Sequence, residues 1–136
     1  MPTDFSNYLR SKGYAEHVVR GGLEGLVNSW ESVTKGLAQA NPAYIMYDEF
    51  LNDMDGRRIL RECIERAAPD ETRAIERRVA EADARFRENT VAVSSCIWGE
   101  DNAGKFDYTP ATDWYYYRRP QIIDDSWPNE FRERAA

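Results

Sequence analysis

The chain has 136 residues, of which 42% are hydrophobic and 31% are charged, a composition typical of one ordinary globular domain. Its net charge is −6, from 18 basic and 24 acidic side chains, which argues against non-specific nucleic-acid binding and against anionic membranes but permits a basic partner. No apolar run is as long as a membrane span, the N-terminal residues are too polar for a signal peptide, and Cys63 and Cys96 are isolated. We therefore expect one cytoplasmic domain over residues 1–136, with reduced thiols in its core.

The first helix is predicted over residues 3–12, where Thr3 can cap it and Gly13 ends it. A second helix is predicted because apolar residues recur at helical spacing over about five turns. They are Val19, Leu23, Leu26, Val27, Trp30, Val33, Thr34 and Leu37. This stripe is the clearest helical signal in the chain, and Asn41 and Pro42 mark its end.

Three glycines, Gly21, Gly22 and Gly25, interrupt the first half of this second helix. Each costs about 1 kcal/mol relative to alanine in a helix interior, so a structural reason for them is expected. The first interpretation is that another backbone approaches closely here. The competing interpretation is a break in the helix near Gly21 and Gly22.

The stretch from Tyr44 to Cys63 contains the densest acidic run and two apolar stripes that face different ways. The first stripe spans about 100° of a helical wheel, and the second centres about 160° away from it. The first comprises Tyr47, Phe50, Leu51 and Met54, and the second comprises Ile59, Leu60, Cys63, Ile64 and Ala67. One straight helix cannot bury both stripes against one neighbour, so we expect a break near Asp55 and Gly56, with Asp55 capping the second helix.

Part of this stretch resembles an EF-hand calcium loop in its spacing. Loop positions 3, 5, 6 and 12 would be Asp53, Asp55, Gly56 and Glu62. However, the first position is Leu51, which has no side-chain oxygen, and the apolar eighth position is Arg58. We therefore expect no calcium site and interpret the carboxylates as a solvated helix end.

A further helix is predicted from Glu71 to Asn89, after a stop and fresh start at Pro69 and Asp70. Its apolar stripe consists of Ile75, Val79, Ala82 and Phe86. The other faces carry many acidic and basic side chains, which we interpret as a solvated surface without a function of its own.

Helical spacing fades after Thr90, and the rest of the chain is rich in aromatic residues. Residues 91–98 have strand propensity, residues 99–113 form a predicted loop, and residues 114–120 read WYYYRRP. The two flanking runs either pair as an antiparallel ribbon or lie as extended coil over the helices. Anchors for a short terminal helix or coil over residues 121–136 are Ile122, Ile123, Trp127 and Phe131.

The predicted fold is therefore mainly α. It is an irregular bundle of four or five helices with a C-terminal extended aromatic segment, which forms a short β-ribbon if its two runs pair. Residues 1–90 are helical, residues 91–120 are extended and aromatic-rich, and residues 121–136 are a short helix or coil.

Few residues point to catalysis. The single histidine is His17, and a lone histidine is more often a structural residue than a catalytic one. A metal site built from Asp48, Glu49 and Asp53 is an alternative, but three carboxylates within two helical turns usually form a solvated face. We expect no metal and no cofactor.

The run WYYYRRP is the most unusual local signal. Alternation along a strand would place Trp114, Tyr116 and Arg118 on one face and Tyr115, Tyr117 and Arg119 on the other. One face would pack on the helices, and the other would present aromatic rings and an arginine, the residue types that dominate binding hot spots. The alternative is that these rings only cover an edge of the core.

The segments FLNDMDGR, DARFRENT and WYYYRRP are similar to those of small bacterial proteins with an aromatic-x-N-D-x-D-x-R type segment and a W-x-x-x-R-x-P type segment. The matching positions are Phe50, Asn52, Asp53, Asp55, Arg57, Asp83, Phe86, Thr90, Trp114, Arg118 and Pro120. This resemblance covers residues 44–120 at most. It implies a bacterial, cytoplasmic origin and no particular activity.

The sequence favours a protein-binding module, an inhibitor or immunity-type protein that neutralises a more basic partner. Its expected binding residues are Asp48, Glu49, Asp53, Asp55, Trp114, Tyr115, Tyr116, Tyr117, Arg118 and Arg119. One alternative is a small enzyme with a carboxylate-lined cleft that includes His17, and another is a structural or oligomeric subunit. No nucleic acid or membrane is expected as a partner, and a homo-oligomer is compatible with the sequence.

Overall fold

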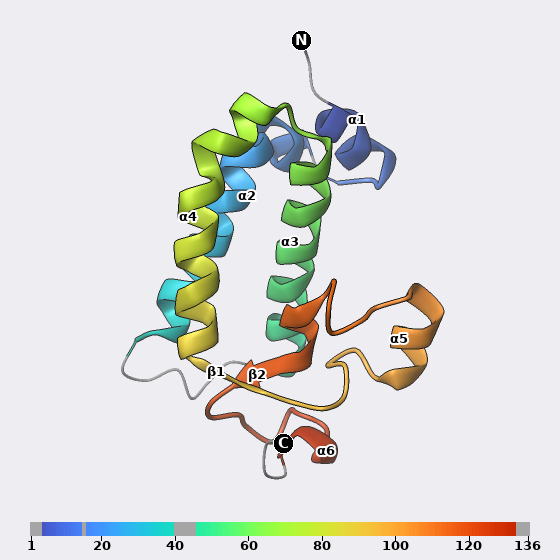
Figure 1. The fold of residues 1–136 in the computed structure, drawn as a ribbon. Helices are drawn as coiled ribbons and strands as arrows, with labels where there is room; N and C mark the ends of the chain where they lie inside the picture. The colour runs from blue at the N-terminus through green and yellow to red at the C-terminus, as the bar shows by residue number, and fades with distance from the viewer. Residues whose placement is uncertain (1–3, 15, 40–45, 133–136) are drawn as a thin grey trace.

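The computed structural model describes residues 4–14, 16–39 and 46–132, and Figure 1 shows their arrangement. In chain order the elements are α1 (Asp4–Ser11), α2 (Glu16–Leu37), α3 (Tyr47–Arg66), α4 (Pro69–Glu88), β1 (Thr90–Ala92), α5 (Glu100–Phe106), the 3-10 helix η1 (Trp114–Tyr117), β2 (Arg118–Pro120) and α6 (Asn129–Arg132). The fold is mainly α with one two-stranded antiparallel ribbon, as the sequence predicts. The predicted cap at Thr3 and the predicted stop at Asn41 and Pro42 lie outside the described residues. None of the described helices combines the length and the apolar character that crossing a membrane requires.

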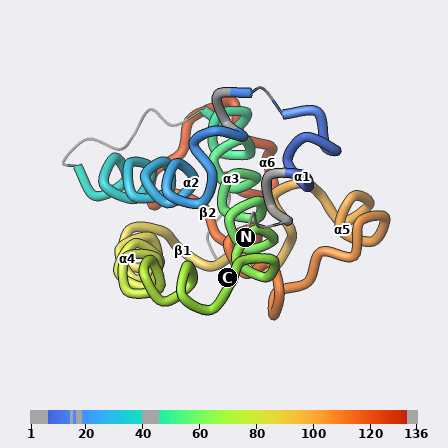
Figure 2. Tube along the Cα trace, turned by 90° about the horizontal axis from the view of Figure 1, so that it is seen from above, coloured from blue at the N-terminus to red at the C-terminus, as the bar shows by residue number. Residues whose placement is uncertain are grey.

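The helix α2 holds the three long helices together, because it packs against both α3 and α4. The helix α1 packs across α2 and α3, and η1 also contacts α3. Figure 2 shows α4 and α5 on opposite sides of α3. The helix α3 is therefore covered by α1, α2 and η1.

The helix α3 runs unbroken from Tyr47 to Arg66, so the predicted break near Asp55 and Gly56 is wrong. Both apolar stripes are nevertheless largely buried, and four of their members have no exposed surface: Phe50, Met54, Leu60 and Cys63. A straight helix can bury both stripes because α1, α2 and η1 cover it on more than one side. Asp55 consequently lies in the middle of a helix and caps nothing.

The helix α2 is kinked at Gly22, where the backbone adopts φ 57° and ψ −150°. This conformation is essentially restricted to glycine. The break expected near Gly21 and Gly22 is thus confirmed. The close-approach interpretation is wrong for Gly21 and Gly25, because a methyl group at either position would meet no neighbouring atom within 4 Å.

The ribbon confirms the predicted pairing of the two runs, but only over three residues in each. Thr90 pairs with Pro120, and Ala92 pairs with Arg118. After β1 the chain runs beside η1 without forming a regular ladder. There the backbone N–H of Ile97 donates to the carbonyl of Tyr116 at 2.8 Å. Two expectations are wrong here: the predicted loop contains α5, and the residues WYYY form a 3-10 helix instead of a strand.

The C-terminal residues close the core over the first turns of α3. Trp127 is 1% exposed and Phe131 is 2% exposed, which confirms both as anchors. The Trp127 ring lies 5.0 Å from that of Tyr47 and 5.3 Å from that of Phe50. Ile122, in contrast, is 55% exposed and anchors nothing.

A buried ion pair connects the long helices. Arg57 on α3 donates from Nε and Nη2 to the two carboxylate oxygens of Asp83 on α4, each at 3.0 Å. The indole N–H of Trp30 on α2 donates to the same carboxylate at 2.8 Å. The Arg57 guanidinium also lies over the rings of Trp30 and Tyr115, at 5.8 and 5.5 Å from their centroids. We call these three residues, Trp30, Arg57 and Asp83, the three-helix clamp.

Candidate functional site

The tyrosines of the WYYYRRP run do not form an exposed binding surface. Tyr115 and Tyr116 are fully buried and Tyr117 is 9% exposed, so their predicted role as surface anchors is wrong. The 3-10 helix directs all three rings inward, where each hydroxyl donates a hydrogen bond. The acceptors are Asp113 for Tyr115, Asp55 for Tyr116 and the carbonyl of Tyr108 for Tyr117. Burial raises the pKa of Tyr115 to about 12.

The remaining residues of this run hold the C-terminal segment in place. The half-buried Trp114 packs against Phe86 and is covered by the guanidinium of Arg87, 3.8 Å from its ring centroid. Arg118 donates from Nε to the hydroxyl of Thr90 at 2.8 Å. The buried Arg119 donates to the carbonyl of Pro120. Neither arginine extends freely from the surface as the strand prediction required.

The acidic residues of α3 separate into different environments. Asp48 and Glu49 are exposed at its first turn. Asp53 is half-buried beside a cavity of about 130 Å³ between α2 and α3, where burial and then the charge of Glu49 raise its pKa to about 6. Asp55 lines the pocket near α5 that is described below, where it accepts hydrogen bonds from Tyr116 and Trp98. The predicted acidic surface is therefore reduced to its N-terminal end.

The residues behind the calcium, metal and enzyme alternatives belong to α2 and α3. The EF-hand-like spacing falls on the unbroken helix α3, which does not have the conformation of a calcium loop. Within residues 4–14, 16–39 and 46–132, no three His, Cys, Asp or Glu side chains form a group that could hold a metal ion. His17 belongs to α2, but its side chain lies outside the description.

A pocket of about 510 Å³ lies where α3, α5 and the residues after α1 meet, and we call it the α3–α5 pocket. This volume is within the range of small-ligand sites. Its aromatic lining residues are Trp98, Phe106 and Tyr108, and its polar lining residues are Lys12, Asp55, Arg58 and Asn102. Asp55 is the one predicted binding residue that lines it.

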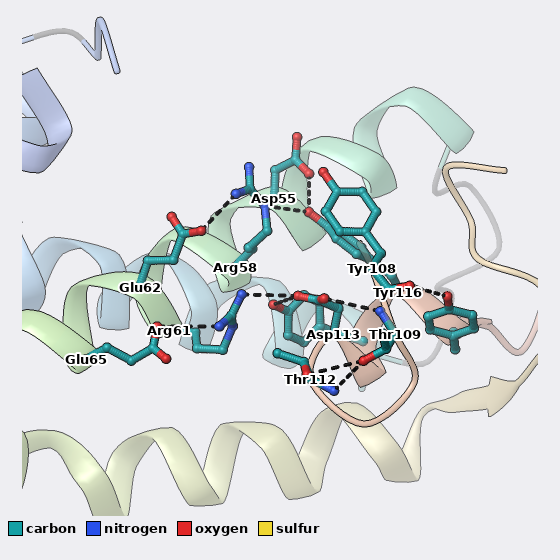
Figure 3. A network of polar contacts seen from close by, with 12 residues as sticks. Asp55, Arg58, Arg61, Glu62, Glu65, Tyr108, Thr109, Thr112, Asp113 and Tyr116 are labelled. Carbon is teal, nitrogen blue, oxygen red and sulfur yellow. Dashed lines mark hydrogen bonds and ion pairs between the residues drawn. The ribbon is translucent and has the colours of Figure 1, made fainter. Parts of the chain in front are cut away.

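A hydrogen-bond network fixes the floor of this pocket (Figure 3). The Tyr116 hydroxyl donates to Asp55 Oδ1 at 2.6 Å and accepts from Arg58 Nε at 3.0 Å. The indole N–H of Trp98 donates to Asp55 Oδ1 at 3.1 Å, and Arg58 Nη1 donates to Glu62 at 3.1 Å. Burial, followed by the carboxylate of Asp55, raises the pKa of Tyr116, so this hydroxyl remains a donor. The floor is therefore pre-organised.

A second group of contacts holds the segment that carries Tyr108 (Figure 3). Arg61 on α3 donates to Asp113 Oδ1 at 3.3 Å, and the other oxygen of Asp113 accepts from the backbone N–H of Thr109 at 3.4 Å. The backbone N–H of Asp113 donates in turn to the carbonyl of Thr109 at 2.8 Å. This turn follows Tyr108 directly, so it fixes one wall of the pocket to α3.

The aromatic wall consists of stacked rings. The Tyr108 ring packs on the buried Tyr116 ring at 4.7 Å, and the Phe106 ring stacks on Tyr108 at 5.7 Å. Asp107 between them has a left-handed backbone, with φ 58°, which ends α5. Phe106 remains 54% exposed at the rim. A large, exposed aromatic ring beside a pocket is typical of a binding surface.

Several polar atoms of the pocket have no hydrogen-bond partner within the described part of the chain. They are Lys12 Nζ, Asp55 Oδ2, Arg58 Nη2 and Asn102 Oδ1. The lining thus carries two cations and one carboxylate. Glu62 lies next to Arg58 but does not line the pocket. These groups offer both donors and acceptors to a ligand.

Sequence reasoning missed most of this site. Phe106, Tyr108 and Asn102 lie in the stretch that the sequence predicts as a loop, and Trp98 lies in a predicted strand. The aromatic content of residues 98–108 is the only signal that could have pointed to it. Comparison of the chain with protein-family models, curated proteins and solved structures finds no match.

Proposed function

We propose that this protein is a protein-binding module that holds its partner at the α3–α5 pocket. The observation that carries this proposal is a pre-organised polar floor next to an aromatic wall whose outer ring, Phe106, is more than half exposed. Aromatic residues and arginine are enriched at protein interfaces and supply most hot spots. The pocket provides all of these residue types on rigid supports.

The acidic end of α3 supports a basic partner. Asp48 and Glu49 are exposed there, and Asp48 lies on the same face of the helix as Asp55, seven residues further along the chain. Two helical turns, or about 10 Å, separate Asp48 from Asp55 at the pocket. Together with the net charge of −6, the exposed carboxylates of Asp48 and Glu49 would accelerate association with a basic protein. We thus propose the inhibitor or immunity-type role that the sequence favours, but with Phe106 and the α3–α5 pocket as its anchors in place of the buried tyrosines.

Loss of the Phe106 ring tests the pocket directly. Burying its exposed half is worth about 1 kcal/mol, so Phe106→Ala should speed partner dissociation about fivefold. Because more than half of the ring is exposed, the substitution should leave the helical circular-dichroism spectrum unchanged. Asp48→Lys together with Glu49→Lys should slow association instead.

The experiment is a pull-down from the native host with wild-type and variant protein, followed by surface plasmon resonance on the recovered partner. The matched control is Arg77→Ala on α4, on the other side of α3 from the pocket, where the side chain is 89% exposed. Wild type and the control should retain the partner equally, and Phe106→Ala should lose most of it. Equal retention by all three proteins would show that the partner binds elsewhere.

A further inference from the structure

The two cations of the α3–α5 pocket are placed to receive an anion. Arg58 is held by two hydrogen bonds, from Nε to Tyr116 and from Nη1 to Glu62, so its third nitrogen, Nη2, is fixed in position. Lys12 reaches the same pocket from the end of α1 and pairs with no carboxylate in the described part of the chain. Because the Arg58 guanidinium is already immobilised, it loses little conformational entropy when a ligand binds. Its planar donors also match the geometry of a carboxylate, so a carboxylate is favoured at this place.

The acceptors of the pocket narrow the choice of anion. Asp55 Oδ1 is occupied by Tyr116 and Trp98, whereas Asp55 Oδ2 and Asn102 Oδ1 are open. An anion without an N–H group would leave both of these acceptors without a donor. A ligand with an N–H group close to its carboxylate satisfies donors and acceptors together.

The aromatic wall adds a third requirement. Phe106, Tyr108 and Trp98 present ring surface beside these polar groups, so the ligand should carry an apolar side chain. A carboxylate, an adjacent backbone N–H and an apolar side chain occur together in the last residue of a polypeptide. Recognition of a C-terminal carboxylate is an established mode of peptide binding.

We propose that the α3–α5 pocket captures the C-terminal residue of the partner protein. The carboxylate binds Arg58 and Lys12, the backbone N–H binds Asp55 or Asn102, and the apolar side chain packs on Phe106. This inference rests on the proposed function and specifies which part of the partner enters the pocket. It agrees with a basic partner, because Asp48 and Glu49 attract the body of that protein while the two cations bind its terminus.

The smallest probe of this chemistry is N-acetyl-L-phenylalanine, which reproduces a C-terminal residue. Its binding can be followed by two-dimensional NMR, with the Trp98 indole N–H as the reporter inside the pocket. We expect saturable shifts at about 1 mM. N-acetyl-L-phenylalaninamide, which lacks the carboxylate, and N-acetylglycine, which lacks the side chain, should each bind about tenfold more weakly or not at all. Free L-phenylalanine tests whether an amino acid with a charged ammonium group is preferred to a peptide terminus.

Matched lysine variants identify the carboxylate contact. Lys12→Gln should weaken N-acetyl-L-phenylalanine binding about fivefold and reduce the preference for the acid over the amide. Lys105→Gln on α5 is the control, because Lys105 is exposed near Phe106 but does not line the pocket. Equal binding of acid and amide, an equal effect of the two variants, tighter binding of free phenylalanine, or no shifts with any probe would each overturn the inference.

The recovered partner separates this inference from the proposed function. Extension of its C-terminus by a short Gly-Ser tail should abolish the Phe106-dependent part of its binding. If the extended partner binds normally but still requires Phe106, the pocket is the interface and the terminus is not its ligand. If Phe106 makes no difference to either form, the proposed function fails together with the inference.

Discussion

Removing the acceptor of the three-helix clamp should destabilise the protein severely. In wild type, Asp83 accepts two hydrogen bonds from Arg57 and one from Trp30, and the side chains of Arg57 and Asp83 are only 9% and 15% exposed. Asp83→Ala leaves the arginine charge buried without a counter-ion. Breaking a buried pair in this way costs about 3 to 5 kcal/mol, a large part of the roughly 5 to 15 kcal/mol by which a domain is stable.

Urea unfolding, followed by tryptophan fluorescence and by circular dichroism, measures this loss as a lower midpoint at unchanged slope. The exposed pair of Arg77 and Glu81 on α4 is the control, and Glu81→Ala should cost less than about 0.5 kcal/mol. Arg57→Met combined with Asp83→Leu should recover part of the lost stability, because no charge then remains buried, although the Trp30 indole N–H still lacks its acceptor. A cost below about 1 kcal/mol for Asp83→Ala would refute the clamp as a determinant of stability.

Further predictions concern the kink, the buried carboxyl and the thiols. Gly22→Ala should lower the free energy of unfolding by about 1 to 3 kcal/mol, whereas Gly21→Ala, at an exposed helical position, should raise it by up to about 1 kcal/mol; urea titration compares the two. The pKa of Asp53 is raised from 3.8 to about 6, so the folded state holds this proton more tightly than the unfolded chain, and stability falls as pH rises between these values. Asp53→Asn should therefore add about 1 to 2 kcal/mol at about pH 7 and little at about pH 4, which urea midpoints across this range will show. Burial raises the pKa of Cys63 to about 11 and also raises that of Cys96, so a thiol-specific disulfide reagent should label neither in the folded protein and both in urea.

The helices that the sequence predicts well are those with one apolar stripe and neighbours on one side. The stripe of α4 from Ile75 to Phe86 is buried as expected. In α3 the wheel correctly identifies two stripes, but the inference of a break assumed that one neighbour must cover both. Periodicity reports which faces are apolar and contains no information on how many elements will cover them. The kink at Gly22, in contrast, follows from local backbone chemistry and was accessible from sequence.

The candidate site could not be predicted because its contacts join residues that are far apart in the chain. Aromatic residues favour strands, and this preference suggested alternating exposure for the run of tyrosines. The long-range partner Asp55, 61 residues from Tyr116, drew that hydroxyl inward instead. The placement of Phe106 beside Tyr108 depends on a single left-handed residue, Asp107, whose conformation no pattern in the sequence signals.

The closure of the core by its C-terminal residues has a consequence for biosynthesis. The first turns of α3 are covered by Trp127 and Phe131, and 65 residues separate Phe131 from the end of α3 at Arg66. At about 5 to 20 residues per second, the ribosome needs roughly 3 to 13 s to add this stretch. During that interval Phe50 can already pack against Phe86, but its contact with the Trp127 ring cannot form. The core can therefore close over the first turns of α3 only after translation has passed Phe131.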